Sequence, residues 1–212
     1  MKPLKYSHII WDWNGTLLDD VDRNLEVINV MLNRRGLPAV GSVEAYRSLF
    51  RFPVVEYYRD AGFDLEAEPF DSLAVEYTEL YYGGGNPRLF PGTERVLRTA
   101  RERGARQIIL SASKTENLRA QVGAFGIAGY FDEILGISDI YAEGKLSAAR
   151  NYAARFPGEK MLLIGDTAHD FEVAEPISAD CVLISNGHQP REALLSLGVP
   201  VLKDIEKILK FI

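Results

Sequence analysis

The chain has 212 residues, of which 47% are hydrophobic and 25% are charged, and its formal net charge is −6. These values are typical of a globular protein with one sizeable domain, or one domain with a smaller insert, and they exclude long disordered stretches. The negative charge disfavours a general nucleic-acid-binding surface, although a local cation can still attract a phosphorylated small molecule.

The chain contains one cysteine, Cys181, so no internal disulfide can form, which fits a reducing compartment. Cys181 lies in the apolar stretch "DCVLIS", and we expect it to be a buried small residue rather than a nucleophile. No apolar run approaches the about 18 residues of a membrane span, and "HIIW" before Asp12 is too short for a signal peptide. We therefore expect a cytoplasmic protein that makes no membrane contact.

The first predicted strand is the apolar run "HIIWDW" at residues 8–13, and a helical segment follows it. Residues 20–88 contain helical patterns and no convincing strand. Apolar side chains at helical spacing in this segment are Leu25, Ile28 and Leu32 in its first pattern, and Phe70, Leu73, Tyr77 and Leu80 in its last. The sequence therefore predicts an all-helical insert at 20–88, with the glycines of "GGGNP" (83–87) as its return hinge.

From about residue 90 onward, strand and helix patterns alternate. The apolar, β-branched runs are "RQIILSA" (106–112), "DEILGI" (132–137), "KMLLIGD" (160–166), "DCVLIS" (180–185) and "VPVL" (199–202). The helical patterns between them lie at 92–104, 113–126 and 144–156, and Ser113 and Glu116 have the spacing of a capping box. This alternation predicts an α/β fold with a doubly wound, mostly parallel sheet, formed by residues 1–19 and 89–212.

Polar side chains follow several of the predicted strands, at the edge where an open α/β sheet binds its ligand. In chain order, they are Asp12, Asn14, Gly15, Thr16, Ser111, Lys145, Gly165, Asp166, Thr167, His169 and Asp170. One crevice would then hold Asp12, Asp166 and Asp170 beside Lys145. Three carboxylates next to one lysine repel one another unless a cation binds, and oxygen ligands of this kind suit Mg²⁺.

These residues resemble the four motifs of the haloacid dehalogenase (HAD) superfamily. The matching stretches are Asp12-Trp13-Asn14-Gly15-Thr16-Leu17, then Ser111, then Lys145, then Gly165-Asp166-Thr167-x-x-Asp170. The helical insert is similar to the small cap of the phosphoglycolate-phosphatase-like branch. The resemblance covers essentially the whole chain, and its first and last motifs are the most specific.

The resemblance implies a Mg²⁺-dependent phosphatase that acts on a small phosphorylated metabolite. Asp12 would be the nucleophile and would form an aspartyl phosphate. Mg²⁺ would be held by the Asp12 side chain, the backbone carbonyl of Asn14 and Asp166, while Asp170 would support the waters of the metal or Lys145. The phosphoryl oxygens would be bound by Ser111, Ala112 and Lys145.

Asn14 departs from this pattern, because family phosphatases generally have an aspartate there that protonates the leaving oxygen and then activates water. An amide does not exchange a proton near neutral pH, and such acid–base help is worth roughly 10²–10⁴-fold. The expectation is a slower phosphatase. Three outcomes are open: a substrate with a good leaving group, such as an acyl or aryl phosphate; another base, for which His169 is the candidate; or turnover that stops at phosphoenzyme or at binding.

Rival interpretations stay open as well. The same fold could perform dehalogenase-like or phosphonatase-like chemistry, although residues 19–88 contain no lysine for a Schiff base. A non-catalytic phospho-ligand-binding protein is a further alternative, whereas a receiver-type phospho-acceptor would leave the insert unexplained. Arg47 and Arg51 lie one helical turn apart and could together bind a carboxylate or second phosphate. The sequence does not predict the oligomeric state.

Overall fold

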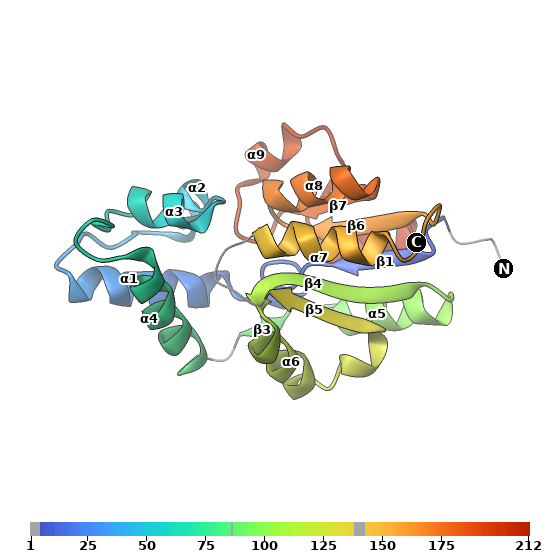
Figure 1. The fold of residues 1–212 in the computed structure, drawn as a ribbon, viewed down its shortest axis with the longest axis horizontal. Coiled ribbons are helices and arrows are strands. Elements are labelled where there is room, and N and C mark those ends of the chain that lie inside the picture. The colour runs from blue at the N-terminus through green and yellow to red at the C-terminus, as the bar shows by residue number, and fades with distance from the viewer. Residues whose placement is uncertain (1–4, 86, 138–142) are drawn as a thin grey trace.

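The computed structural model describes residues 5–85, 87–137 and 143–212 (Figure 1). A six-stranded sheet forms its centre in the spatial order β5-β4-β1-β6-β7-β8, and each neighbouring pair of strands is parallel. The strands are β1 (His8–Trp11), β4 (Arg106–Lys114), β5 (Glu133–Ile137), β6 (Met161–Gly165), β7 (Asp180–Ile184) and β8 (Val201–Leu202).

The central strands are apolar throughout because both faces of the sheet are buried. Ile9 of β1 belongs to one buried cluster and Ile10 to the other, as the two-residue period of a strand requires. Their partners across the ladder, Leu162 and Leu163 of β6, divide in the same way. This double burial is why the sequence shows continuous apolar runs rather than alternation.

Helices cover both faces of the sheet, which confirms the doubly wound α/β fold (Figure 1). One face carries α5 (Thr93–Glu102) and α6 (Thr115–Ala124). The other face carries α7 (Glu143–Ala153), α8 (Ala168–Ala174) and α9 (Arg191–Leu195). Short 3₁₀ helices occupy Ala128–Tyr130, Glu175–Ile177 and Ile205–Lys210.

The predicted capping box of Ser113 and Glu116 is wrong. Strand β4 continues to Lys114, with a shift in its register against β5 after Leu110, and α6 begins only at Thr115 without a side-chain cap. The Ser113 hydroxyl instead donates to another residue, Oδ1 of Asn14, at 2.9 Å. A tertiary contact therefore takes the side chain that the local pattern assigned to a helix start.

Residues between the short strands β2 (Leu18–Asp19) and β3 (Arg88–Leu89), which pair antiparallel, form four helices. They are α1 (Val21–Arg34), α2 (Val43–Leu49), α3 (Val54–Asp60) and α4 (Phe70–Tyr82). Their apolar faces form a third buried cluster around Ile28, Leu32 and Leu73. Figure 1 shows these helices beside the sheet rather than over its faces. We call them the helical insert; residue 86, in the predicted hinge, lies outside the described residues.

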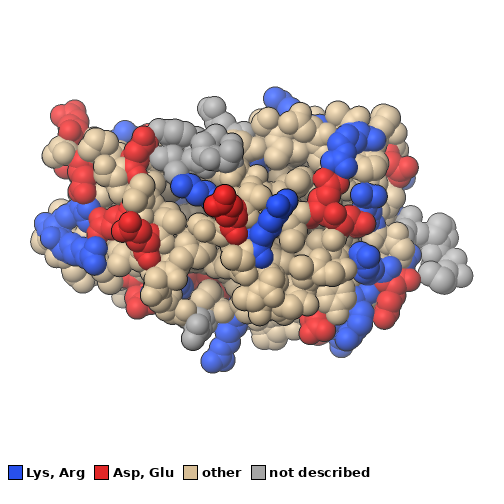
Figure 2. Space-filling view, turned by 60° about the horizontal axis from the view of Figure 1, so that its bottom comes forward, with Lys and Arg blue, Asp and Glu red and all other residues tan. Residues whose placement is uncertain are grey.

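Three expectations about the rest of the chain can be compared with the structure. Cys181 is buried in β7, as predicted. No helix among the described residues is long and apolar enough to cross a membrane. On the face drawn in Figure 2, basic and acidic side chains are interspersed rather than gathered by sign.

Candidate active site

The carboxyl ends of the central strands bring predicted site residues to one edge of the sheet. β1 lies between β4 and β6, and Asp12 directly follows β1 while Asp166 directly follows β6. Ser111 lies near the end of β4 and is buried. The Asp12 N–H donates to the carbonyl of Ile164 at 2.8 Å, which extends the pairing of β1 and β6 to Asp12. Residues that are far apart in sequence therefore meet here.

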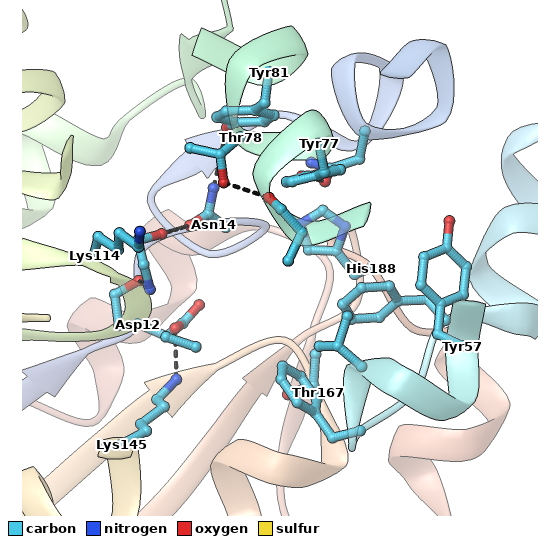
Figure 3. Close-up of a pocket in the computed structure, with 18 of the residues that line it drawn as sticks. Asp12, Asn14, Tyr57, Tyr77, Thr78, Tyr81, Lys114, Lys145, Thr167 and His188 are labelled. Atoms are coloured by element: carbon cyan, nitrogen blue, oxygen red, sulfur yellow. Dashed lines mark hydrogen bonds and ion pairs between the residues drawn. The ribbon is translucent and has the colours of Figure 1, made fainter. Parts of the chain in front are cut away.

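Lys145, in the first turn of α7, is a buried cation at this edge. Its Nζ donates to Oδ1 of Asp12 at 2.6 Å (Figure 3). The same Nζ donates to Oδ1 of Asp170, also at 2.6 Å. Burial disfavours the charged ammonium, but the two carboxylates outweigh it and hold the pKa of Lys145 above its usual value. Burial also raises the pKa of Asp12 to about 6, against the attraction of Lys145.

Asp166 and Asp170 border the turn from β6 into α8. Asp170 uses its second oxygen, Oδ2, to accept from the N–H of Asp166 at 3.1 Å, the N–H of Thr167 at 3.0 Å and the Thr167 hydroxyl at 2.7 Å. Asp166 accepts from the Thr16 hydroxyl at 3.2 Å and from the N–H of His188 at 2.6 Å. Both carboxylates are therefore fixed by donors of the surrounding loops.

The three carboxylates fit a divalent cation. Ligand atoms of Asp12, Asp166 and Asp170 all lie within 4.8 Å of one another. Burial raises the pKa of Asp166 well above its usual value, and the charges of Asp12 and Asp170 add to the rise. A bound cation would stabilise the ionised carboxylates against burial and against their mutual repulsion. Carboxylate and carbonyl oxygens are the ligands that Mg²⁺ prefers.

Asn14 lies in the tight turn after β1, and its side chain is held from both ends. Its Nδ2 donates to Oδ2 of Asp20 at 2.7 Å and to the Tyr81 hydroxyl at 3.1 Å, while its Oδ1 accepts from Ser113. Because the ionised Asp20 can only accept, the amide nitrogen must face it. Gly15 follows with a φ of 71°, and a Cβ there would overlap the Asp166 carboxylate, so the turn needs glycine.

Asp20 and His188 form a buried ion pair beside Asn14. His188 Nε2 lies 3.2 Å from Oδ1 of Asp20, and its Nδ1 lies 2.8 Å from the Tyr46 hydroxyl. Asp20 also accepts from Nδ2 of Asn24 at 2.8 Å and from the Tyr81 hydroxyl at 2.7 Å. Burial disfavours both charges, but their attraction outweighs it, raising the pKa of His188 to about 9 and holding the pKa of Asp20 below its usual value.

Asp20 and His188 are site residues that the sequence patterns do not indicate. Asp20 precedes α1, where an acidic residue is expected to cap the helix, yet its side chain makes no capping hydrogen bond and turns to the site. His188 belongs to "NGHQP", just beyond the carboxyl end of β7. The strand-end argument that selects Asp12 and Asp166 also selects His188 once it is extended to β7.

A cavity of about 220 Å³ opens above these residues. The core forms its floor with Asp12, Ser111, Ala112, Lys145 and Asp166. Opposite the floor, Figure 3 shows side chains of the helical insert, among them Tyr77, Thr78 and Tyr81. The proposed nucleophile therefore faces a space that both parts of the chain enclose.

Arg47 and Arg51 do not form the joint binding fork that the sequence left open. Arg47 donates to the backbone carbonyls of Gly187 at 2.8 Å and Asn186 at 2.6 Å. Arg51 lies 2.6 Å from Oδ2 of Asp60. Each guanidinium thus has a protein partner, and neither is among the described residues that line the cavity.

His169 lies beside the site rather than in it. Its ring stacks on Phe52 with 4.6 Å between ring centres, and its Nδ1 lies 3.3 Å from Oε2 of Glu172. Among the described residues that line the cavity, His188 is present and His169 is absent. The geometry therefore gives no support to His169 as a substitute for an acid at position 14.

The chain is similar to several known proteins. A family model described as haloacid dehalogenase-like hydrolase matches residues 6–177. A phosphoglycolate phosphatase of Caulobacter vibrioides is 24% identical over 201 residues, which cover 90% of this chain and 85% of that protein. The tyrosine-protein kinase PtkA of Mycobacterium tuberculosis strain H37Rv is 26% identical over 186 residues, covering 85% of this chain and 62% of the kinase.

The fold has close counterparts among solved structures. A haloacid dehalogenase-like family protein from Streptococcus pneumoniae superposes with a TM-score of 0.84 at 18% identity. The match covers 97% of this chain and 98% of the other. The similarity thus includes the helical insert as well as the sheet.

Proposed function

Since the chain belongs to the haloacid dehalogenase-like hydrolase family, we propose that it is a phosphatase of small phosphorylated metabolites, with Asp12 as nucleophile. The observation that carries this proposal is the buried contact of the Asp12 carboxylate with Lys145 at the floor of the cavity. The named activities of the two relatives, a phosphatase and a protein kinase, both transfer a phosphoryl group, which supports the same chemistry. We also propose that residues 20–88 act as a cap over this floor.

In the proposed reaction, an oxygen of Asp12 forms a bond to phosphorus while the bond to the leaving oxygen breaks. Lys145 keeps Asp12 ionised and, with the Ser111 hydroxyl and the backbone N–H of Ala112, binds the phosphoryl oxygens. Water then attacks the phosphorus of the aspartyl phosphate, which releases inorganic phosphate and restores the carboxylate. The residues that this step uses all line the cavity, and Asn14 stands where a proton donor would be expected.

The proposed metal site consists of the carboxylates of Asp12 and Asp166 and the backbone carbonyl of Asn14. The two oxygens of Asp170 accept hydrogen bonds from Lys145 and Thr167. We therefore assign Asp170 the role of positioning the lysine and supporting the waters of the metal. When bound, Mg²⁺ neutralises charge on the nucleophile and on the phosphoryl group, so that the two anions can approach.

Asn14 is the reason to propose slow turnover. Its amide donates to Asp20 and Tyr81 and has no proton to transfer. This residue also favours a second candidate function, the binding of a phosphorylated ligand without turnover. The two candidates differ in whether phosphate is released.

The test is the release of inorganic phosphate from a panel of phosphate esters with Mg²⁺. We expect weak wild-type turnover that disappears in EDTA and falls by about 10⁴-fold or more in Asp12→Asn, as when other enzymes lose their nucleophile. Circular dichroism and thermal melting would check that the variant is folded. Equal activity in wild type and Asp12→Asn would refute the nucleophile. Binding without release in wild type would favour the second candidate.

A further inference from the structure

The wall of the cavity is aromatic, and the helical insert supplies it. The rings come from the segment that joins α2 to α3, from α3 and from α4. Those that the argument uses are Phe50, Phe52, Tyr57, Tyr58, Tyr77 and Tyr81. Rings attract other rings through their faces and edges, so such a wall favours an aromatic ligand over an ionised one.

None of the described residues of the insert offers this cavity a cation. Each arginine of its helices and their connections has a protein partner: Arg23 on backbone carbonyls, Arg47 on the core, and the others on carboxylates (Arg34, Arg35, Arg51, Arg59). The cations among the described lining residues, Lys114, Lys145 and His188, come from the core. Figure 3 places Lys114 next to Asn14, on the floor side. A carboxylate placed against the wall would therefore lose water without gaining a partner there.

The hydroxyl of Tyr57 is a buried polar group on a residue of the wall. Tyr57 lines the cavity and is buried, but its hydroxyl has no hydrogen-bond partner among the described residues. Buried hydroxyls usually have a partner, because an unpaired one costs free energy.

The size of the cavity fits a single ring. A cavity of about 150 Å³ in another protein is large enough to bind benzene. The cavity of this protein is about 220 Å³ and has the Asp12 carboxylate at its floor. A phenyl group can thus lie against the wall while its phosphate reaches Asp12.

Asn14 selects for the same substrates through the leaving group. Without a proton donor, the leaving oxygen departs as an anion, and a phenol, with a pKa of about 10, is a far stronger acid than an aliphatic alcohol. Phosphate esters of phenols therefore need the missing acid least. The wall and the floor point to one class of substrate by independent arguments.

We propose that the substrate is an aryl phosphate, with its ring against the aromatic wall and its phosphate at Asp12; this rests on the proposed function. In the step, an Asp12 oxygen bonds to phosphorus as the bond from phosphorus to the aryl oxygen breaks. The phenoxide leaves with the electron pair and takes a proton from water. A second water hydrolyses the aspartyl phosphate to inorganic phosphate and the Asp12 carboxylate.

The first part of the test measures ring recognition without turnover. Calorimetry with Mg²⁺ would compare phenylphosphonate with phosphonoacetate, which carries a carboxylate in place of the ring. We expect wild type to bind phenylphosphonate about tenfold more tightly or better, as ring contacts predict. Equal or tighter binding of phosphonoacetate would overturn the proposal.

A matched pair of variants locates the ring. Ala74→Leu adds bulk to a residue that lines the cavity, whereas Val75→Leu adds bulk to its exposed neighbour on α4. We expect phenylphosphonate binding to weaken about tenfold in Ala74→Leu and to stay unchanged in Val75→Leu. An equal response of the two variants would place the ring elsewhere and overturn the assignment of the wall.

The second part measures hydrolysis of phenyl phosphate, benzyl phosphate and 2-phosphoglycolate. Benzyl phosphate keeps the ring but has an alcohol as leaving group. We expect kcat/KM to fall in the order given, with the step from phenyl to benzyl reporting the leaving group. A preference for 2-phosphoglycolate would overturn the proposal. Tight binding of phenylphosphonate without hydrolysis of any ester would support ring recognition and refute the proposed catalysis, so the two can fail separately.

Discussion

At the floor of the cavity, charged side chains contact one another. At the wall, aromatic rings face the cavity, and the charged side chains of the insert form their contacts away from it. On the floor, Lys145 contacts Asp12 and Asp170 directly, and the whole group is buried. In the insert, Arg35 instead joins Glu68 and Glu76 away from the cavity. The core thus gathers its buried charges at the cavity, and the insert uses charge to hold its helices together.

This difference follows from the elements that form each part. Parallel strands end at a common edge, so their loops bring Asp12 and Asp166 together whatever their distance in sequence. Helices α3 and α4 instead present a face, and the face that turns to the cavity carries rings such as Tyr58 and Tyr77. The proposed function therefore assigns phosphate chemistry to the core and selectivity to the insert.

The largest effect is expected at His188, where the two parts meet. His188→Gln would remove the positive charge beside the buried Asp20, and breaking a buried pair in this way costs about 3–5 kcal/mol. We expect urea denaturation at pH 6 to show a loss of that order in the free energy of unfolding. The double variant Asp20→Asn, His188→Gln should be less destabilised than His188→Gln alone. A single variant as stable as wild type would mean that the pair does not hold the junction.

The same pair predicts how stability changes with pH. The pKa of His188 is raised to about 9 in the folded protein, above about 6.5 in an unfolded chain. The stabilisation by the charged ring is therefore fully present below pH 6.5 or so and is lost as the pH rises through about 9. In EDTA, the unfolding free energies of wild type and His188→Gln should converge across this range. A constant gap between them would contradict the assignment.

A smaller effect tests the missing acid. The carboxylate that Asn14→Asp introduces would face the carboxylate of Asp20, and the two would repel each other. In the double variant Asn14→Asp, Asp20→Asn, the acid and the amide change places. We therefore expect a greater gain in kcat from the double variant than from Asn14→Asp alone. For benzyl phosphate, kcat of the double variant should rise by about 10²-fold, the low end of acid–base catalysis. Phenyl phosphate should gain less, because its leaving group needs less help.

The control for this series is Asp20→Asn alone, which restores no acid at position 14 and should not gain. Asn-Gly sequences are prone to deamidation, which would convert Asn14 to aspartate. Peptide mass spectrometry of wild type should therefore accompany the assay, and it should show Asn14 with its amide. A double variant no faster than wild type, with its fold intact, would show that the amide is not what limits the rate.

The smallest effect is expected at Arg47, which links α2 to the loop that carries His188. Arg47→Ala removes its hydrogen bonds to Asn186 and Gly187, each worth about 1 kcal/mol, and KM for phenyl phosphate should rise by about threefold to tenfold. Arg51→Ala, a matched loss from an exposed ion pair with Asp60, should leave KM unchanged. Equal values of KM in the two variants would contradict this prediction, because substrate binding would then not depend on the contacts of Arg47 with the loop.

The sequence predicts the floor better than the wall, for physical reasons. Asp12 and Asp166 directly follow apolar strands, and a parallel sheet leaves such residues one place to meet. Tyr77 has the helical spacing of a core residue, and spacing alone does not tell whether a ring faces other helices or a cavity.

Two residues show where local patterns fail. Ser113 has the spacing of a helix cap, but β4 extends past it and its hydroxyl reaches Asn14. Asp20 pairs with His188 across 168 positions of sequence, and no local pattern joins such distant residues. Contacts of this kind depend on how the insert sits on the sheet.

The most direct test of the account is to look for the phosphoryl group on Asp12. Wild type with Mg²⁺ and phenyl phosphate, quenched in acid within the first turnover, should release phenol in a burst and carry one phosphoryl group on the peptide that contains Asp12. This is expected because Asn14 slows the attack of water more than the departure of phenol. Steady phosphate release by wild type, undiminished in Asp12→Asn and with no phosphorylated Asp12 peptide, would contradict it.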